Sequence, residues 1–267
     1  MMDGTIALEF SQIEAYIKSF MWPLIRISAM TMSMVVLGSA ILSPQKRIAA
    51  SLAITAVIVP VLPPMPDVAM TGYEGWAITI QQLFIGLAIG FTSRLIFETF
   101  IIGGQIVAMS SGLGFAVIND PSSGIAIPAV GQFFLMMATL IFLAVDGHLL
   151  MFDIIIRSFY SLPISTQGIS MEALSGLFVL AGDMFNVGMR MALAAVISLL
   201  MANLTFGILT KVAPSLNIFV IGFPMILTAG LLILWFTINS FDYYFDMQFY
   251  NGMDLACQFV KLECTNG

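Results

Sequence analysis

The stretch IFVIGFPMILTAGLLILWFTINS occupies residues 218–240, and none of its residues carries a charge. A helix needs about 20 predominantly apolar residues to cross the hydrocarbon core of a bilayer. The length and composition of this run therefore predict a membrane helix. Pro224 lies inside the run, and proline distorts a helix because it lacks a backbone N–H. We expect the helix to be kinked at this position.

Other runs of the chain repeat this pattern. They are Phe20–Leu42, Ile48–Leu62, Trp76–Phe97, Ile125–Leu150 and Leu174–Thr210. Small-residue spacings, such as Gly86 and Gly90, permit close contact between helices. The pattern predicts an all-α, polytopic membrane protein of about six kinked hydrophobic helices arranged as helical hairpins. No low-complexity linker separates the runs, so we expect a single domain over residues 1–267.

The overall composition excludes several function classes. The chain has 267 residues, of which 60% are hydrophobic and 9% are charged, and its net charge is -6. Soluble domains are about 45–50% apolar and about 25% charged. An ordinary cytosolic enzyme and a disordered chain are therefore excluded. A nucleic-acid reader would carry a basic stripe, which this acidic chain lacks.

Basic residues suggest an orientation, because Lys and Arg favour cytoplasmic loops. Lys46 and Arg47 place the first short loop inside, and Lys211 places the turn before residue 218 inside. Six crossings would then leave both termini outside. The two cysteines, Cys257 and Cys264, lie near the C-terminus. We expect free thiols, unless the tail faces an oxidising compartment where the two can pair.

Charged residues inside apolar runs are costly and indicate pairing or function. Three pairs of opposite charge lie on common helical faces, at spacings of four or seven residues, which allow salt bridges. These are Arg94 with Glu98, Asp153 with Arg157, and Asp183 with Arg190. We expect them to make contacts between helices or subunits. A proton pathway is the less favoured alternative.

No pattern of an enzyme is present. His148 is the only histidine, with Asp146 two residues before it. A zinc site needs three or four ligands of suitable geometry, and none is clustered here. We expect His148 to be a hydrogen-bonded residue at a helix end, and we expect no catalytic residue, no metal and no cofactor.

The segment Gly103–Gly124 is both glycine-rich and apolar. Glycine permits backbone shapes that are closed to other residues. An apolar segment of this kind in the middle of a membrane protein indicates a buried plug or a re-entrant segment. The chain also has 20 methionines, whose flexible side chains either fill gaps between helices or line a deformable pore.

Several motifs, taken in order, resemble the FliR family of flagellar export-gate subunits, with which the T-type subunits of virulence type III secretion belong. They comprise Arg26, Gly38, Pro44, Arg47, Gly104-Gln105, Gly112-Leu113-Gly114-Phe115-Ala116, Asp120-Pro121, Gly131-Gln132, Gly147-His148, Leu162-Pro163 and the stretch VAPSLNIFVIGFP at 212–224. The resemblance covers the chain from about Phe20 to Phe241. Many members carry Asn where this chain carries Asp146.

The resemblance implies a fold and a set of partners. Family members assemble with P-type and Q-type subunits (FliP, FliQ) into a closed helical hetero-oligomeric gate, beside the B-type switch subunit (FlhB). It implies that residues 1–170 are P-subunit-like and that residues 171–267 form a Q-subunit-like hairpin and tail. The turn of that hairpin would carry Pro214, Asn217, Gly222 and Pro224.

The resemblance also implies a channel plug over residues 105–122. Its members would be Gln105, Met109, Gly112, Leu113, Gly114, Phe115, Ile118, Asp120 and Pro121. The apolar side chains would close the channel, the two glycines would be hinges, and Asp120-Pro121 would anchor the return of the loop.

Our leading hypothesis is a non-enzymatic, channel-forming subunit of the flagellar type III export apparatus, which passes unfolded flagellar proteins. It would lie in the bacterial inner membrane within the flagellar basal body, in contact with lipid and projecting to the periplasmic side. The alternatives are a secondary transporter of small molecules, which should show internal symmetry, and an assembly chaperone without a pore. No convincing repeat supports the transporter.

Overall fold

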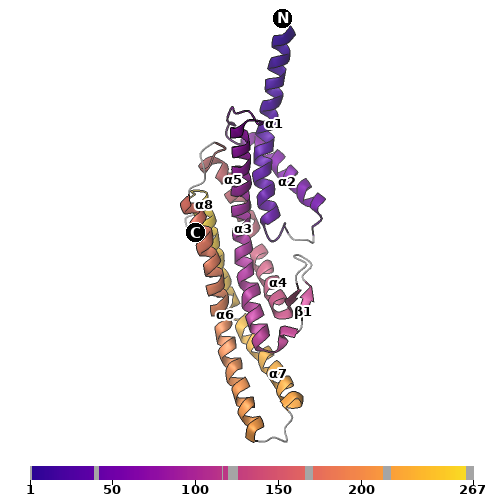
Figure 1. The fold of residues 1–267 in the computed structure, drawn as a ribbon, viewed down its shortest axis with the longest axis vertical. Helices are drawn as coiled ribbons and strands as arrows, with labels where there is room; N and C mark the ends of the chain where they lie inside the picture. Colours follow the sequence, from indigo (N-terminus) through magenta and orange to yellow (C-terminus); the bar gives the residue numbers. More distant parts are fainter. Residues whose placement is uncertain are drawn as a thin grey trace. The chain divides into compact units, whose positions relative to one another are not determined.

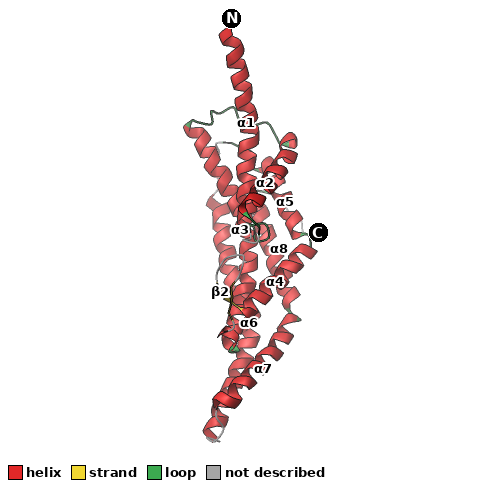
Figure 2. Ribbon diagram, turned by 90° about the vertical axis from the view of Figure 1, so that its right-hand side faces the viewer, coloured by secondary structure: helices red, strands yellow, loops and turns green. Residues whose placement is uncertain are grey.

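Helices make up nearly all of the computed structural model of the chain, which describes residues 2–38, 42–115, 117–119, 126–165, 171–212 and 218–262 (Figures 1 and 2). The helices in the described ranges are α1 (Met2–Ser33), α2 (Pro44–Ile58), α3 (Tyr73–Ser110), α4 (Ala129–Ala144), α5 (Gly147–Ser161), α6 (Met171–Val212), α7 (Ile218–Ile238) and α8 (Phe241–Phe259). Short 3-10 turns follow α2 and α3, as η1 (Val59–Val61) and η2 (Leu113–Phe115). The strands β1 (Val117–Asn119) and β2 (Ala126–Pro128) form one antiparallel pair.

The predicted all-helical, polytopic fold is confirmed, and each of the six apolar runs contains a helix. Two of the runs continue into a second helix that the sequence analysis did not separate. α4 is followed by α5 at a bend of 64°, and α7 is followed by α8 at a bend of 54°. α5 and α8 were missed because they carry charged residues, such as Asp153 and Asp246, that interrupt the apolar pattern.

The candidate membrane spans are fewer than the six crossings that the sequence analysis assumed. In the described ranges, α3 and the part of α6 from Ser175 to Leu209 are long and apolar enough to cross a bilayer. The bent pairs α4–α5 and α7–α8 raise the number to four if each pair is one span. α2 has only 15 residues, and α1 carries Lys18 and Arg26 within its apolar part.

The chain divides into two compact units, each built from separate pieces of sequence. Unit 1 contains Met1–Arg94, Asp146–Phe178 and Met253–Gly267. Unit 2 contains Leu95–Val145 and Val179–Gly252. The long helices α3, α6 and α8 therefore each contribute residues to both units.

Unit 1 is held together by close helix contact and by buried hydrogen bonds. A Cβ atom built on Gly86 of α3 would lie 2.8 Å from the Cβ of Ala29 on α1, so only glycine permits this approach. The contact confirms the close packing expected from the glycine spacing. Trp22 of α1 donates to Thr79 Oγ1 of α3 at 3.3 Å, and Thr31 of α1 is hydrogen-bonded to Ser51 of α2 at 2.8 Å.

Unit 2 has a core of stacked phenylalanine rings from α3, α4 and α8, which we call the aromatic column. Neighbouring ring centroids lie 4.8–5.9 Å apart, within the range of favourable aromatic pairs. The column comprises Phe134, Phe241, Phe100, Phe245, Phe249, Phe142 and Phe97. All seven rings are buried.

Cys257 corrects the expectation of free thiols. This residue, near the end of α8, is buried and is part of a disulfide. The other cysteine of the sequence, Cys264, lies outside the described residues. Disulfides persist in oxidising compartments, and we expected the two cysteines to pair only in such a compartment.

Candidate functional site

The non-helical segment predicted to be the plug begins after Ser110, and not at residue 105 as expected. α3 continues through Gly103 and Gly104 to Ser110, so Gln105 and Met109 lie on a helix and not in a loop. Gln105 is half-buried, whereas Met109 in the last turn of α3 is 77% exposed. Gly103 and Gly104 stay helical because residues of α6 and α4 pack closely against them.

We call residues 111–128 the gate segment. Gly112 has φ 75°, a left-handed conformation that glycine adopts without steric cost. This residue ends α3 and turns the chain into η2, which contains Leu113, Gly114 and Phe115. A Cβ atom built on Gly114 would lie 3.4 Å from the Cα of Met109, so the turn folds back over the last turn of α3.

The strands β1 and β2 close the base of the gate segment. Val117 pairs with Pro128 and Ile118 pairs with Ile127. η2 contacts β2 and α4, so the described parts of the segment pack within unit 2 (Figure 1). Asp120 and Pro121 lie outside the described residues, as do Ala116 and residues 122–125. The roles assigned to the plug residues stay predictions.

The predicted charged pairs behave differently from one another. Arg157 Nε lies 2.8 Å from Asp153 Oδ2, and both residues belong to α5. This pair is an exposed salt bridge within one helix and not a contact between helices. An exposed pair of this geometry contributes about 0.3–0.5 kcal/mol.

The other two pairs also lie along single helices. Arg94 and Glu98 are on α3, where Arg94 is exposed and Glu98 is half-buried. Asp183 and Arg190 are on α6, and neither makes an ion pair with another residue in the described part of the chain. Whether these charges contact another subunit stays a prediction.

The bend between α4 and α5 lies beside the only histidine. Asp146, which precedes α5, is exposed and has φ 55°. Asn and Asp are enriched in this left-handed conformation, which explains why either residue suits the position. His148 Nδ1 is buried and has no hydrogen-bond partner among the described residues, so this nitrogen does not make the hydrogen bond that we expected of the side chain. The same residues contain no group of three or more His, Cys, Asp or Glu that could hold a metal.

Arg26 was identified from the sequence only as a motif residue, and its contacts in unit 1 were not predicted. Arg26 of α1 is fully buried, and its guanidinium donates to Gln82 Oε1 at 2.7 Å, to Ser158 O at 3.0 Å and Oγ at 3.1 Å, and to Leu162 O at 3.0 Å. It also lies over the ring of Phe159, 4.3 Å from the centroid. The three hydrogen-bonded residues belong to α3 and to the C-terminal end of α5. We call this arrangement the Arg26 cluster.

Among the residues that the structure describes, no carboxylate takes part in the Arg26 cluster. The C-terminal carbonyls of α5 supply the negative end of a helix dipole, which stabilises a cation. Burial lowers the pKa of Arg26 to about 9, so the group still carries its charge at neutral pH. The signal that was available in the sequence is an arginine inside an apolar run, which by itself indicates a buried partner or a function.

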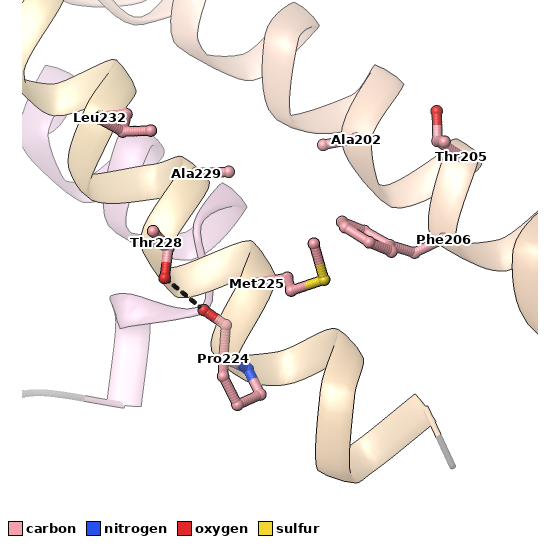
Figure 3. Close-up of a pocket in the computed structure, with 8 residues that line it drawn as sticks. All are labelled: Ala202, Thr205, Phe206, Pro224, Met225, Thr228, Ala229 and Leu232. Atoms are coloured by element: carbon pink, nitrogen blue, oxygen red, sulfur yellow. Dashed lines mark hydrogen bonds between the residues drawn. The ribbon is translucent and has the colours of Figure 1, made fainter. Parts of the chain in front are cut away.

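An apolar groove of about 480 Å³ separates α6 and α7 in unit 2 (Figure 3). Its lining residues are Ala202, Thr205, Phe206, Pro224, Met225, Thr228, Ala229 and Leu232. Thr228 Oγ1 donates to the carbonyl oxygen of Pro224 at 2.8 Å, so the hydroxyl is satisfied within its own helix. Of the predicted hairpin-turn residues, Gly222 and Pro224 lie on α7, whereas Pro214 and Asn217 lie outside the described residues.

One face of α6 presents apolar side chains that nothing in unit 2 covers. Only 17% of an apolar 18-residue stretch of its candidate span is buried. The exposed residues follow helical spacing along one face and include Phe185, Met189, Leu193, Ile197, Leu200, Leu204 and Ile208. A contiguous apolar surface of this kind marks contact with a membrane or with another protein. We call it the α6 face.

Comparison with known proteins gives consistent matches over most of the chain. Residues 17–252 match the family described as Bacterial export proteins, family 1. The flagellar biosynthetic protein FliR of Pectobacterium carotovorum subsp. carotovorum is 35% identical over 219 residues, which cover 82% of this chain and 84% of the relative. FliR of Escherichia coli strain K12 is 32% identical over 217 residues, covering 81% and 83%. FliR of Bacillus subtilis strain 168 is 24% identical over 219 residues, covering 81% and 84%.

Proposed function

The chain belongs to the bacterial export proteins, family 1, and is a subunit of the flagellar type III export apparatus, and on that premise we propose that it helps to form and close the export channel. Unfolded flagellar proteins would pass through this channel. The role is structural and not catalytic. The closing element is the gate segment.

The geometry of the gate segment carries this proposal. The segment leaves α3 through the left-handed turn at Gly112 and is closed at its base by the pairing of β1 with β2. A short hairpin with a fixed base can occupy one position and still yield to a passing chain. Met109, Leu113, Phe115 and Ile118 are apolar, and an apolar constriction excludes water and ions.

The α6 face and the groove beside it support a second part of the proposal, which concerns partners. Apolar surface of this extent is stable in a membrane-embedded assembly, where lipid or neighbouring helices cover it. We assign the cover to the P-type and Q-type subunits, FliP and FliQ, with the B-type subunit FlhB as a further neighbour. Residues 1–170 would take a P-subunit-like place and residues 171–267 a Q-subunit-like place.

The location of the protein in the cell is inferred from its family and from its apolar helices. A flagellar export subunit with apolar helices is a membrane-embedded component of the flagellum. We assign it to the inner membrane at the basal body, with the assembled gate projecting to the periplasmic side. The disulfide of Cys257 supports an oxidising surrounding for the end of α8.

Ion permeability tests the closing role. Residues 113–122 are replaced by a Gly–Ser linker of equal length, which leaves α3 intact. The control is the same replacement at residues 63–72, the irregular segment before α3. Both variants are first shown to co-purify with FliP and FliQ. We expect cells with the first variant to leak ions and cells with the control to stay closed, and an assembled first variant that does not leak would refute the closing role.

Co-purification tests the partner surface. Leu204 on the α6 face is 58% exposed, so Leu204→Gln should leave the fold of the chain unchanged. We expect this variant to lose the large hetero-oligomer in detergent, whereas the neighbouring exposed change Asn203→Gln retains it. A Leu204→Gln chain that assembles as well as the control contradicts the assignment of the α6 face.

A further inference from the structure

One side of α3 in unit 1 is apolar wherever it is exposed. Every exposed residue of this helix from Trp76 to Phe91 is apolar. The opposite side is packed against α1, as the contact of Gly86 with Ala29 shows. The large exposed residues recur at helical spacing, and we call them the α3 face: Trp76, Ile80, Leu83, Phe84, Leu87 and Phe91. An apolar surface of this kind marks contact with a membrane or with another protein.

α2 presents a second apolar surface at the same level of unit 1. Its exposed residues from Ile48 to Val57 are all apolar. Ser51 of α2 is hydrogen-bonded to Thr31 of α1, and Ser33 Oγ of α1 lies 3.4 Å from the carbonyl oxygen of Leu87 on α3. The exposed surfaces of α2 and α3 therefore need the same kind of surrounding.

Aromatic side chains with a polar group mark one end of the α3 face. α1 and α3 run in the same direction, with Trp22 hydrogen-bonded to Thr79 (Figure 1). Tyr16 of α1 therefore lies level with the start of α3. The exposed fractions of Tyr16, Tyr73 and Trp76 are 77%, 89% and 63%. Tyr and Trp are enriched where membrane helices meet the lipid headgroups, because their rings are apolar and carry one polar group.

Basic side chains mark the other end. Arg94 of α3 is exposed, and so is Lys46 in the first turn of α2. α2 runs back along α1, so Lys46, which precedes Ser51, lies toward the same end as Arg94. The exposed carboxylates of Asp67 and Glu74 lie at the aromatic end. Anionic lipids of the cytoplasmic leaflet attract basic side chains at their surface.

The distance between the two ends matches the thickness of a bilayer. From Trp76 to Arg94, α3 rises about 27 Å at about 1.5 Å per residue. The hydrocarbon core of a bilayer is about 30 Å thick. A partner helix could cover the apolar residues, but it would not require aromatic side chains at one end and basic side chains at the other. Lipid accounts for the apolar face, for both ends and for their separation.

We propose that the α3 face lies against lipid in a chain that has not yet joined the gate. Tyr16, Tyr73 and Trp76 lie in one headgroup layer, and Lys46 and Arg94 lie in the other. Because Lys and Arg favour the cytoplasmic side, the basic end faces the cytoplasm. The partner of this surface is a bilayer with anionic headgroups. The inference concerns the free chain and goes beyond the closing role and the partner surface proposed above.

Fluorescence quenching measures the depth of the α3 face. Each variant carries Trp235→Phe and keeps one tryptophan. Trp22→Phe leaves Trp76, whereas Trp22→Phe with Trp76→Tyr and Phe84→Trp moves the tryptophan to the middle of the face. The full chain is purified without partners and placed in vesicles of phosphatidylethanolamine and phosphatidylglycerol, with bromine on the acyl chains near the headgroup or near the bilayer centre. We expect shallow bromine to remove most of the Trp76 fluorescence, and deep bromine to remove most of the fluorescence of the Phe84→Trp variant.

The control keeps only Trp22, which is fully buried at a neighbouring level of unit 1. Its fluorescence should change little with either lipid. If iodide in solution and not bromine quenches the Phe84→Trp variant, water lies at the α3 face. If neither quenches it, protein such as a second copy of the chain covers the face. Either result overturns the proposal, and Leu87→Trp gives the same measurement if the Phe84→Trp chain does not insert.

Thiol labelling in cells that lack FliP and FliQ tests the orientation. Glu74→Cys and Lys46→Cys each place one thiol at an exposed position, at opposite ends of the α3 face. Cys257 is in a disulfide, and the unaltered chain is the blank. A membrane-impermeant maleimide should label Glu74→Cys in intact cells, and Lys46→Cys only after the membrane is opened. Labelling of both in intact cells, or the reverse order, would refute the proposal. The ion leak of the assembled gate is a separate measurement, so failure here leaves the proposed function unaffected.

Discussion

Replacement of Arg26 by methionine should destabilise unit 1 strongly, although it removes a buried charge. Methionine keeps much of the volume but donates no hydrogen bond. Ser158 loses little, because its carbonyl still accepts from Leu162 N and its hydroxyl still donates to Ile155 O. Gln82 Oε1 and Leu162 O lose the only donor that they have among the described residues. These two acceptors set the size of the effect.

A buried acceptor left without a partner costs roughly 1–3 kcal/mol. Two such acceptors cost about 2–6 kcal/mol, and the part-buried Leu162 O contributes at the low end of its range. In domains of 150–250 residues, 1 kcal/mol shifts the melting midpoint by about 2–4 °C. We therefore expect the midpoint of Arg26→Met to fall by at least about 4 °C.

The assay is the loss of the monodisperse peak in size-exclusion chromatography after heating of the detergent-purified protein. Arg190→Met is the matched control, because Arg190 on α6 is exposed and makes no ion pair with a described residue. Arg26→Lys should be intermediate, since an ammonium group keeps the charge but cannot reach acceptors on three sides. A midpoint for Arg26→Met no lower than that of Arg190→Met would refute the role of the Arg26 cluster.

Three further predictions use the same heating assay. Gly86→Val forces α1 away from α3 and should cost about 1–3 kcal/mol, whereas Gly182→Val on open α6 surface should cost less; equal midpoints would contradict the close α1–α3 contact. Asp146→Val places a β-branched residue in a left-handed conformation and should cost about 1–2 kcal/mol, whereas Asp146→Asn should be neutral. Asp153→Asn removes an exposed pair worth about 0.3–0.5 kcal/mol and should leave the midpoint unchanged, and a large loss would show that the pair is buried in an interface.

The sequence predicts the helices well where apolar residues are continuous. The runs that became α3, α6 and α7 contain few charges, and their length alone indicates helices. The same criterion overlooks α5 and α8, because each buries only one face and keeps charged residues such as Asp153 and Asp246. Amphipathic helices of this kind need a periodic pattern, not a hydrophobic run, to be recognised.

The candidate site is predictable only in part, for two physical reasons. The turn into the gate segment follows from local conformation, since Gly112 adopts a left-handed φ that the motif suggests. The residue at which the segment starts does not follow from local conformation, because Gly103 and Gly104 remain helical once other helices pack against them. The Arg26 cluster joins residues 56 to 136 positions apart, and no local pattern encodes such contacts.

The Arg26 cluster and the aromatic column imply that the packing of unit 1 and the packing of unit 2 differ in rigidity. Hydrogen bonds from one guanidinium have defined directions, so α1, α3 and α5 share a single register in unit 1. The ring contacts in unit 2 have weaker directional preferences than hydrogen bonds, because much of their stabilisation is hydrophobic, so a small displacement changes their geometry at modest cost. The packing of unit 1 is therefore expected to resist small displacements of its helices, whereas the packing of unit 2 is expected to accommodate them. The described parts of the gate segment belong to unit 2.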